Sequence, residues 1–302
     1  MFALEKNKAT LIGVSLLLAG LLGGCSANTA PSEASPHSVG PNGRLASMTT
    51  LSQSAYGVPG LNIYSLKYWS RGHLIQEYLD IPSGKGPFPI LVFLHGGWMG
   101  AMPLHHVNRV QGVLTSATLP LAAQWASYKM IVVLPNFAGY GPSGGAVSTP
   151  RQNALDALNG LSALQQICGL HVKADETYLL GGSMGGAVAI YMAERASDIR
   201  AAVLISPGLN TLWGTKFRVD LPVLFLAGRQ DTVFPPGIEE MSYDVLRSHD
   251  GKSVAFSFEP GGHFPLSQSW GDMIAWFGRH GLPFGLLQES TTAPHIRMCT
   301  AQ

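Results

Sequence analysis

Charged residues are scarce in this chain: Asp, Glu, Lys and Arg make up 12% of its 302 residues, against 46% for hydrophobic residues. Such a composition supplies a large core and is unlike that of a disordered segment or a coiled coil. The 19 basic and 18 acidic residues leave a formal net charge of +1, and they form no basic stripe or acidic tail. Nucleic acids are therefore not expected as partners.

A long apolar segment is lacking near the N-terminus, where the uncharged, leucine-rich run covers only residues 11–22. A transmembrane helix needs about 20 apolar residues, whereas a shorter run after Lys6 and Lys8 is typical of a secretory signal. The stretch Leu22-Gly23-Gly24-Cys25 resembles the lipobox of bacterial lipoproteins. In that family the chain is cut before the cysteine, and the cysteine sulfur receives a diacylglyceryl group.

The resemblance implies a lipoprotein signal peptide at residues 1–24 and a lipidated Cys25. The mature protein would be exported and anchored to a bacterial membrane, on its periplasmic or cell-surface side. Each buried CH₂ contributes about 0.8 kcal/mol, so several acyl chains would make the attachment effectively permanent. An ordinary secretory signal and a short membrane anchor are the alternatives.

Cysteine is also scarce, with only Cys168 and Cys299 besides Cys25. If Cys25 carries lipid, an even pair remains, and an exported protein could join that pair in a disulfide. Two unpaired thiols are the alternative, because the sequence does not establish the distance between the two residues.

The chain divides into four parts. After the signal peptide, residues 25–60 are rich in Ser, Ala, Pro, Thr and Gly and are predicted to be a flexible tether. Residues 61–281 are expected to form the main folded domain, and residues 282–302 are expected to be a loosely defined tail.

Within the domain, residues 61–82 are predicted to be an antiparallel hairpin. Apolar runs without interruption then alternate with helical stretches, which indicates an α/β fold with a mostly parallel sheet covered by helices on both faces. The expected strands are residues 89–94, 130–134, 177–180, 201–205, 223–227 and 254–258. The expected helices are residues 121–128, 151–166, 185–196, 237–248 and 268–277.

The most informative motif is Gly181-Gly182-Ser183-Met184-Gly185, which lies between an expected strand and an expected helix. That order predicts the nucleophile elbow of a serine hydrolase, in which a serine sits at a strained turn with glycines beside it. The helix after the turn aims its first N–H groups at the site. A second match, Gly141-Pro142-Ser143-Gly144-Gly145, is followed by loop residues, and we interpret Ser143 as part of a turn.

A serine hydroxyl needs a base, and the base needs a third group to orient it. In serine hydrolases with this elbow the partners follow in the order Ser, acid, His, each on a loop after a strand. Asp231 follows the strand at 223–227, and His263 follows the strand at 254–258 between glycines. The sequence therefore predicts a triad of Ser183, Asp231 and His263.

An oxyanion hole is expected beside the elbow. The strand at 89–94 ends in His95-Gly96-Gly97-Trp98, and the backbone N–H groups of Gly97 and Trp98 would supply one half of the hole. The N–H of Met184 would supply the other half. Neither a metal nor a cofactor is expected, because the neighbouring His105 and His106 cannot easily converge on one ion without further ligands.

Residues from about 61 to 281 resemble the α/β-hydrolase superfamily, and within it the catalytic domain of prolyl oligopeptidases and the dienelactone-hydrolase-like esterases. The stretches that carry the resemblance are residues 68–82, Gly-Pro-Phe-Pro at 86–89 leading into His-Gly-Gly-Trp, residues 135–141, and the Gly-Gly-Ser-Met-Gly-Gly of the elbow. It implies the α/β-hydrolase fold and the same triad.

The chain departs from both groups. Oligopeptidases often carry arginine where this chain has Ala138, and a large propeller usually precedes their catalytic domain, which a tether of about 35 residues cannot supply. Dienelactone hydrolases use cysteine where this chain has Ser183. These departures favour a carboxylic-ester hydrolase that acts on a small-molecule or acylated substrate. A serine peptidase or amidase is the first alternative, and a non-catalytic, lipid-anchored binding protein is the second.

Overall fold

The computed structural model describes residues 40–51, 61–97, 118–207, 209, 220–249, 253–282 and 295–299. The expected signal peptide and Cys25 lie outside these residues, as do Trp98, His105 and His106. None of the described helices has the length and apolar character needed to cross a membrane.

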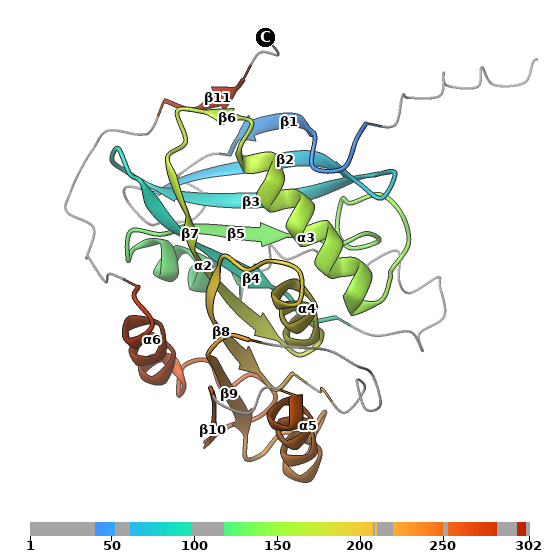
Figure 1. Ribbon diagram of the computed structural model, residues 1–302, viewed down its shortest axis with the longest axis vertical. Coiled ribbons are helices and arrows are strands. Elements are labelled where there is room, and N and C mark those ends of the chain that lie inside the picture. Colours follow the sequence, from blue (N-terminus) through green and yellow to red (C-terminus); the bar gives the residue numbers. More distant parts are fainter. Residues whose placement is uncertain are drawn as a thin grey trace, which may run out of the picture. The chain divides into compact units, whose positions relative to one another are not determined.

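The described residues fold around a nine-stranded sheet with the order β1-β2-β3-β5-β4-β7-β8-β9-β10 (Figure 1). The strands β1, β2, β3 and β5 pair antiparallel, and all the neighbours from β5 to β10 pair parallel. Their bounds are β1 (Leu45–Thr50), β2 (Leu61–Ser70), β3 (His73–Pro82), β4 (Phe88–Leu94), β5 (Ile131–Pro135), β7 (Val172–Gly182), β8 (Ile199–Ile205), β9 (Val223–Gly228) and β10 (Val254–Glu259). Every residue of β5 and β9 is buried, as expected for parallel strands covered on both faces.

Helices cover both faces of the sheet. They are α2 (Thr118–Ala126), α3 (Pro150–Leu164), α4 (Met184–Ala193), α5 (Pro236–His249) and α6 (Trp270–Arg279). One core cluster contains Ala157 of α3, Val188 of α4 and Leu246 of α5. The other contains Trp125 of α2 and Phe277 of α6, whose ring centroids lie 5.6 Å apart. The α/β fold predicted from the sequence, with a mostly parallel sheet covered by helices on both faces, is therefore confirmed.

The predicted hairpin is β2 and β3, joined by the two residues Arg71 and Gly72. Both residues have positive φ angles, 49° and 81°, as a two-residue hairpin turn of type I′ requires.

The structure corrects the prediction of a tether over residues 25–60. Residues 45–50 of that stretch form β1, which pairs with β2 at the edge of the sheet. Leu45 is buried and Met48 packs against the core, so the two large apolar residues of this segment both contribute to folding. The remaining parts of the predicted tether, residues 25–39 and 52–60, lie outside the described residues.

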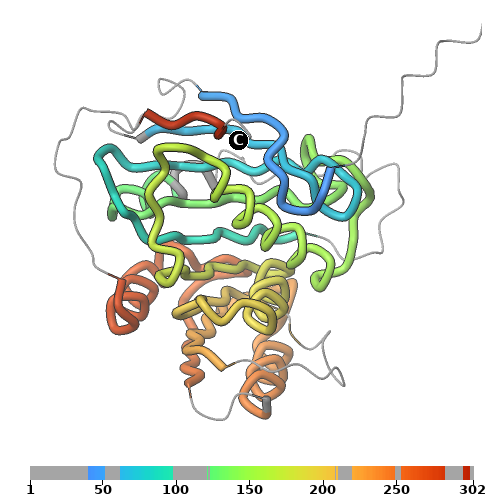
Figure 2. The backbone as a smooth tube through the Cα atoms, turned by 45° about the horizontal axis from the view of Figure 1, so that its top comes forward, coloured from blue at the N-terminus to red at the C-terminus, as the bar shows by residue number. Residues whose placement is uncertain are grey.

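The structure also corrects part of the predicted tail. The short strand β11 (Arg297–Met298) pairs antiparallel with β6 (Ile167–Cys168), and a disulfide joins Cys168 to Cys299 with the two Cα atoms 5.1 Å apart. Figure 2 shows β11 lying beside the N-terminal strands. Gln166 forms hydrogen bonds to both the N-terminal and the C-terminal segment. Its side chain accepts a hydrogen bond from the Leu45 N–H and donates one to the Gly43 carbonyl. Its backbone carbonyl accepts a hydrogen bond from the Cys299 N–H.

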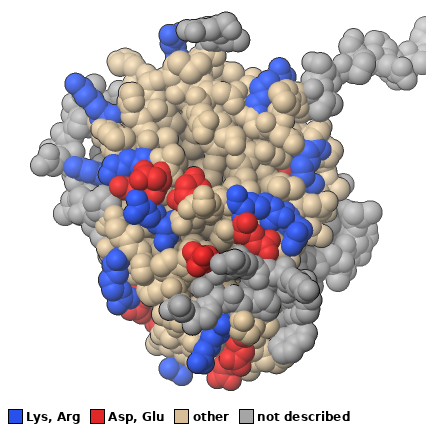
Figure 3. Space-filling view, in the orientation of Figure 1, with Lys and Arg blue, Asp and Glu red and all other residues tan. Residues whose placement is uncertain are grey.

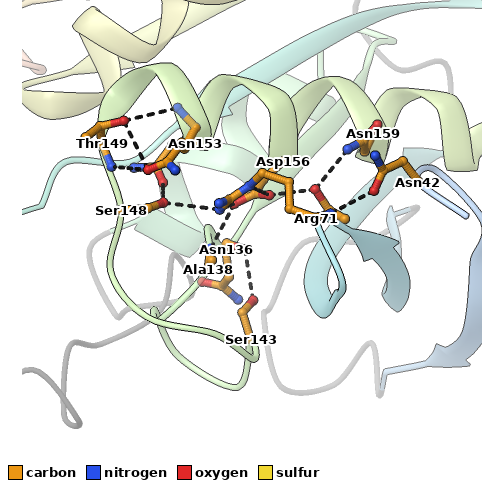
Figure 4. A network of polar contacts seen from close by, with 12 residues as sticks. Asn42, Arg71, Asn136, Ala138, Ser143, Ser148, Thr149, Asn153, Asp156 and Asn159 are labelled. Carbon is orange, nitrogen blue, oxygen red and sulfur yellow. Dashed lines mark hydrogen bonds and ion pairs between the residues drawn. The ribbon is translucent and has the colours of Figure 1, made fainter. Parts of the chain in front are cut away.

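A buried polar network ties the hairpin turn to α3 and to the loop after β5 (Figure 4). The Arg71 guanidinium contacts both carboxylate oxygens of Asp156, at 2.9 Å from Nε and 2.8 Å from Nη2. Asp156 also accepts hydrogen bonds from the Ser70 hydroxyl (2.6 Å) and the Ala138 N–H (3.1 Å). The carboxylate is fully buried and has a cation and two further donors, so its charge is compensated. The hydrogen bond between Ala138 and Asp156 therefore fixes the loop after β5 to α3.

Candidate active site

The backbone at Ser183 has the strained conformation expected of a nucleophile elbow. Ser183 lies between the end of β7 and the start of α4, with φ 52° and ψ −124°, a region that residues other than glycine rarely adopt. Its N–H donates to the Ile205 carbonyl at 2.8 Å, which fixes the turn to the neighbouring strand. The strain is therefore held by the surrounding sheet.

The glycines on either side of Ser183 are required by close backbone contacts. A Cβ atom on Gly181 would come within 3.0 Å of the Gly185 carbonyl oxygen, and one on Gly185 would come within 3.0 Å of the Leu94 carbonyl oxygen. Real Cβ atoms do not approach backbone so closely. The two glycines thus let α4 begin directly against the ends of β7 and β4, with Ser183 at the turn.

The two other predicted triad residues are in contact. The His263 Nδ1 atom lies 2.8 Å from Asp231 Oδ2, and the second carboxylate oxygen, Oδ1, accepts hydrogen bonds from the N–H groups of Val233 (2.8 Å) and Phe234 (2.9 Å). Burial would raise the pKa of Asp231, but the hydrogen bonds to His263 and to these two N–H groups lower it below its ordinary value. Asp231 is therefore an ionised acceptor that orients the imidazole of His263.

The loops that carry Asp231 and His263 are joined to each other. The Gln230 N–H donates to the Gly261 carbonyl at 2.8 Å, and the Arg229 N–H donates to the Glu259 carbonyl at 2.9 Å. Gly228 leaves room for this contact, because a Cβ atom there would overlap the Gly262 carbonyl oxygen. The two loops follow adjacent parallel strands, β9 and β10, and leave the sheet at the same edge.

The loop of His263 also lies against the elbow, through the next residue in the chain. The Phe264 ring is 2.8 Å from the position of a Cβ on Gly182 and 3.4 Å from that of a Cβ on Gly96. The Ser183 Cβ is 3.2 Å from the same point on Gly96. The ends of β4, β7 and β10 thus converge around Ser183, and Phe264, at 49% exposed, forms an apolar wall beside it.

The predicted oxyanion strand has a defined peptide orientation. His95 is buried, and burial lowers its pKa to about 4 despite an opposing effect of its hydrogen bond to the Gly96 carbonyl. The ring is therefore neutral at pH 7, and Nδ1 donates to that carbonyl at 2.6 Å. Because the C=O and N–H of one trans peptide point in opposite directions, the N–H of Gly97 is directed away from His95. Trp98, the other residue predicted here, lies outside the described residues.

The second Gly-x-Ser-x-Gly match has a structural role. The Ser143 hydroxyl donates to the Asn136 carbonyl at 2.9 Å and accepts from the Gln76 N–H at 3.0 Å. Ser143 lies in a turn that it fastens to β3, as predicted. Among the described residues no group of three or more His, Cys, Asp or Glu side chains could hold a metal ion.

Two residues close to the site were not predicted from the sequence. Phe264 could have been found from its position next to the predicted base. Tyr140 lies within the 135–141 stretch that resembles the hydrolases, but no sequence pattern marks it individually; it contacts both residues of the predicted oxyanion hole, Gly97 and Met184. A Cβ on Gly97 would lie 2.6 Å from the Tyr140 hydroxyl oxygen, and that hydroxyl donates to the Met184 sulfur at 3.6 Å.

Solved structures share this fold over most of their length. An esterase of Pyrococcus furiosus is similar with a TM-score of 0.56 and 16% identity, over 72% of this chain and 92% of that one. An acetyl xylan esterase of a Thermoanaerobacterium species is similar with 0.57 and 15%, over 78% and 88%. The rice cell wall degrading esterase of Xanthomonas oryzae is similar with 0.57 and 12%, over 80% and 97%.

No curated protein matches this sequence. The family model described as "Alpha/beta hydrolase family" matches residues 91–275, which make up more than half of the chain. The matched segment contains the elbow of Ser183 and the loops of Asp231 and His263. The chain therefore belongs to the alpha/beta hydrolase family.

Proposed function

We propose that the protein is a serine hydrolase that cleaves carboxylic esters through an acyl-enzyme intermediate. Ser183 is the nucleophile, His263 the general base and Asp231 the residue that orients the base. One observation carries the proposal: His263 contacts Asp231 at 2.8 Å, and the loop of His263 lies against the strained elbow of Ser183.

The contact between His263 and Asp231 determines which ring nitrogen takes part in the reaction. Because the Nδ1 atom of His263 is bound to Asp231, Nε2 is the nitrogen left to accept the Ser183 proton as Oγ attacks the ester carbonyl carbon. The ester C–O bond then breaks, and the alcohol leaves with the proton from Nε2. Water attacks the acyl-enzyme in the same way and releases the acid, which restores the Ser183 hydroxyl.

The oxyanion that forms at each attack would accept hydrogen bonds from the N–H groups of Met184 and Gly97. Met184 is the first residue of α4, where the backbone N–H groups have no partner within the helix, and the helix dipole favours negative charge. Removing one such donor in other enzymes lowers kcat by about 10²–10³-fold. Trp98 would be the further donor from the sequence prediction.

Ester substrates are favoured over peptides by the comparisons, because the three similar structures are all esterases by name. On the face shown in Figure 3, side chains of both charges are interspersed, so this face has no field of one sign that would attract a charged polymer.

The test is a substrate panel on the full-length protein in detergent, with nitrophenyl esters, a thioester and aminoacyl nitroanilides. The expected result is hydrolysis of the esters and a loss of at least about 10⁴-fold in kcat for Ser183→Ala. Ser143→Ala is the matched control, because it removes the serine of the other Gly-x-Ser-x-Gly match; it loosens the turn that Ser143 fastens but keeps the proposed nucleophile, so the loss in kcat should be far smaller than that of Ser183→Ala. Faster turnover of nitroanilides than of esters would make the protein a peptidase or amidase instead.

We further propose that the protein is exported and held at a bacterial membrane by lipid on Cys25. The disulfide between Cys168 and Cys299 supports export, because disulfides form and persist in oxidising compartments. The test is metabolic labelling with an alkyne fatty acid. The expected label on the wild-type protein should be absent from Cys25→Ala, and equal labelling of both would contradict the anchor.

A further inference from the structure

We infer that Tyr140 is a positioning residue that sets the separation of the two oxyanion donors, Gly97 and Met184. The inference rests on the proposed function, because it concerns the transition state of that reaction. Tyr140 comes from neither the elbow nor the strand that ends at Gly97; it lies on the loop after β5.

The contacts of Tyr140 place it between the two donors. Three atoms of its ring and hydroxyl lie 2.6–2.9 Å from the position of a Cβ on Gly97, so the Gly97 backbone rests directly on the phenol. The same hydroxyl donates to the Met184 sulfur at 3.6 Å. One side chain thus contacts the residues that supply both halves of the proposed hole.

The phenol itself is held rigidly. Tyr140 is fully buried, and its ring packs edge-on against His95 with the centroids 4.9 Å apart. Burial raises the pKa of Tyr140 to about 12, so the hydroxyl remains a donor over the working range of pH. His95 is the residue that orients the Gly96–Gly97 peptide, so Tyr140 supports this strand end at two adjacent residues.

The loop that carries Tyr140 is fastened at both ends. The Ala138 N–H donates to Asp156, and Ser143 is bound to Asn136 and Gln76. Met184 receives a second hydrogen bond, from the Asn153 amide at 3.7 Å. The buried network of Figure 4 therefore reaches the oxyanion site from two directions, through the loop to Tyr140 and through α3 to Met184.

Tyr140→Phe keeps the ring and removes the hydroxyl that lies against Gly97 and donates to the Met184 sulfur. A donor that is misplaced by a fraction of an ångström binds the oxyanion less well without affecting ground-state binding. We expect kcat for the best ester to fall about tenfold, with KM within about twofold. The affinity for a boronic acid that mimics the tetrahedral intermediate should fall by the same factor as kcat.

Tyr178→Phe is the matched control. Tyr178 is also fully buried, and its hydroxyl donates to the His280 carbonyl at 3.2 Å, but it packs in the core cluster of the opposite sheet face. It should change the melting temperature without changing kcat or the boronic acid affinity. Met184→Leu keeps the backbone N–H and removes the sulfur acceptor, so it tests the same contact if Tyr140→Phe does not fold.

Two results would support the inference together: the split between kcat and KM, and effects of Tyr140→Phe and Met184→Leu that do not multiply in the double variant. A kcat of Tyr140→Phe equal to that of the wild type would overturn the inference. So would a boronic acid affinity that is the same in Tyr140→Phe and in the control Tyr178→Phe. Failure of the proposed function would look different, because Ser183→Ala would then keep its activity.

Discussion

Glu77 of β3 is a buried acid that the proposed reaction does not use. It is fully buried, and in the part of the chain that the structure describes neither carboxyl oxygen has a hydrogen-bond partner. Gly160 of α3 makes room for it, since a Cβ there would overlap one carboxyl oxygen and lie 3.0 Å from the Tyr68 hydroxyl. Burial raises the pKa of Glu77 from 4.5 to about 8, so the folded protein holds this proton at neutral pH.

The raised pKa of Glu77 determines how the stability of the protein changes with pH. The unfolded chain releases the Glu77 proton near pH 4.5, whereas the folded chain keeps it up to about pH 8. Between these values unfolding releases a proton, so the free energy of unfolding falls as pH rises. At 1.36 kcal/mol per pH unit, the interval from 4.5 to about 8 corresponds to about 5 kcal/mol.

Glu77→Gln removes this ionisation and keeps the shape of the side chain. At pH 4 both side chains are neutral, so the variant should differ from the wild type only by the exchange of a carboxyl for an amide, within about 1–2 kcal/mol. At pH 8.5 the variant should be more stable than the wild type by up to about 5 kcal/mol relative to that baseline. Asp80, whose pKa burial raises to about 7, is present in both proteins and cancels in the comparison.

The assay is urea denaturation at pH values from 4 to 9 with the disulfide intact. The expected result is a difference in unfolding free energy that grows with pH between about 4.5 and 8 and is constant above. A difference that stays the same at every pH would refute the reasoning. It would mean that the Glu77 carboxyl loses its proton at a similar pH in the folded and unfolded chains.

Three further predictions concern the triad, the apolar wall formed by Phe264 and the disulfide. Asp231→Asn should lower kcat by about 10⁴-fold with little change in KM, measured by steady-state kinetics on the best ester; a loss below tenfold would contradict the orienting role. Phe264→Ala removes the apolar wall beside Ser183 and should raise kcat/KM for long acyl chains relative to acetyl, measured across nitrophenyl esters of two to eight carbons; an unchanged profile would mean that the ring does not bound the acyl site. The Cys168–Cys299 bridge joins residues 131 positions apart in the sequence. Its reduction should lower the unfolding free energy by up to about 5 kcal/mol, because it frees the unfolded chain from a long closed loop. A denaturation midpoint that is the same with and without reductant would contradict this stabilising role.

The sheet and its helices could be predicted because their signals are local. Strands such as β5 and β9 are uninterrupted apolar runs, and α3 begins with a Thr149–Gln152 capping box after a glycine-rich loop. β1 could not be predicted, because Leu45 and Met48 are the only large apolar residues in a segment otherwise composed like the tether. Its strand character comes from pairing with β2, which no local pattern encodes.

In the candidate site, too, some residues could be predicted from local patterns and others could not. Ser183, Asp231 and His263 each follow a strand, and parallel strands deliver their C-terminal ends to one edge, so chain order was enough to predict them. Tyr140 and Phe264 make contacts between segments far apart in sequence, and their residue types alone suggest ordinary packing. Asp156 is similar: a carboxylate within a helix suggests a solvated face, and only the fold shows Arg71 beside it.

The central claim is that Ser183 is the nucleophile, and covalent labelling tests it most directly. The full-length protein is treated with a fluorophosphonate and measured by intact mass, and the labelled peptide is then identified. The account predicts one adduct, located on Ser183, absent from Ser183→Ala and retained in Ser143→Ala. An unlabelled wild type, or an adduct on Ser143 or another residue that persists in Ser183→Ala, would contradict it.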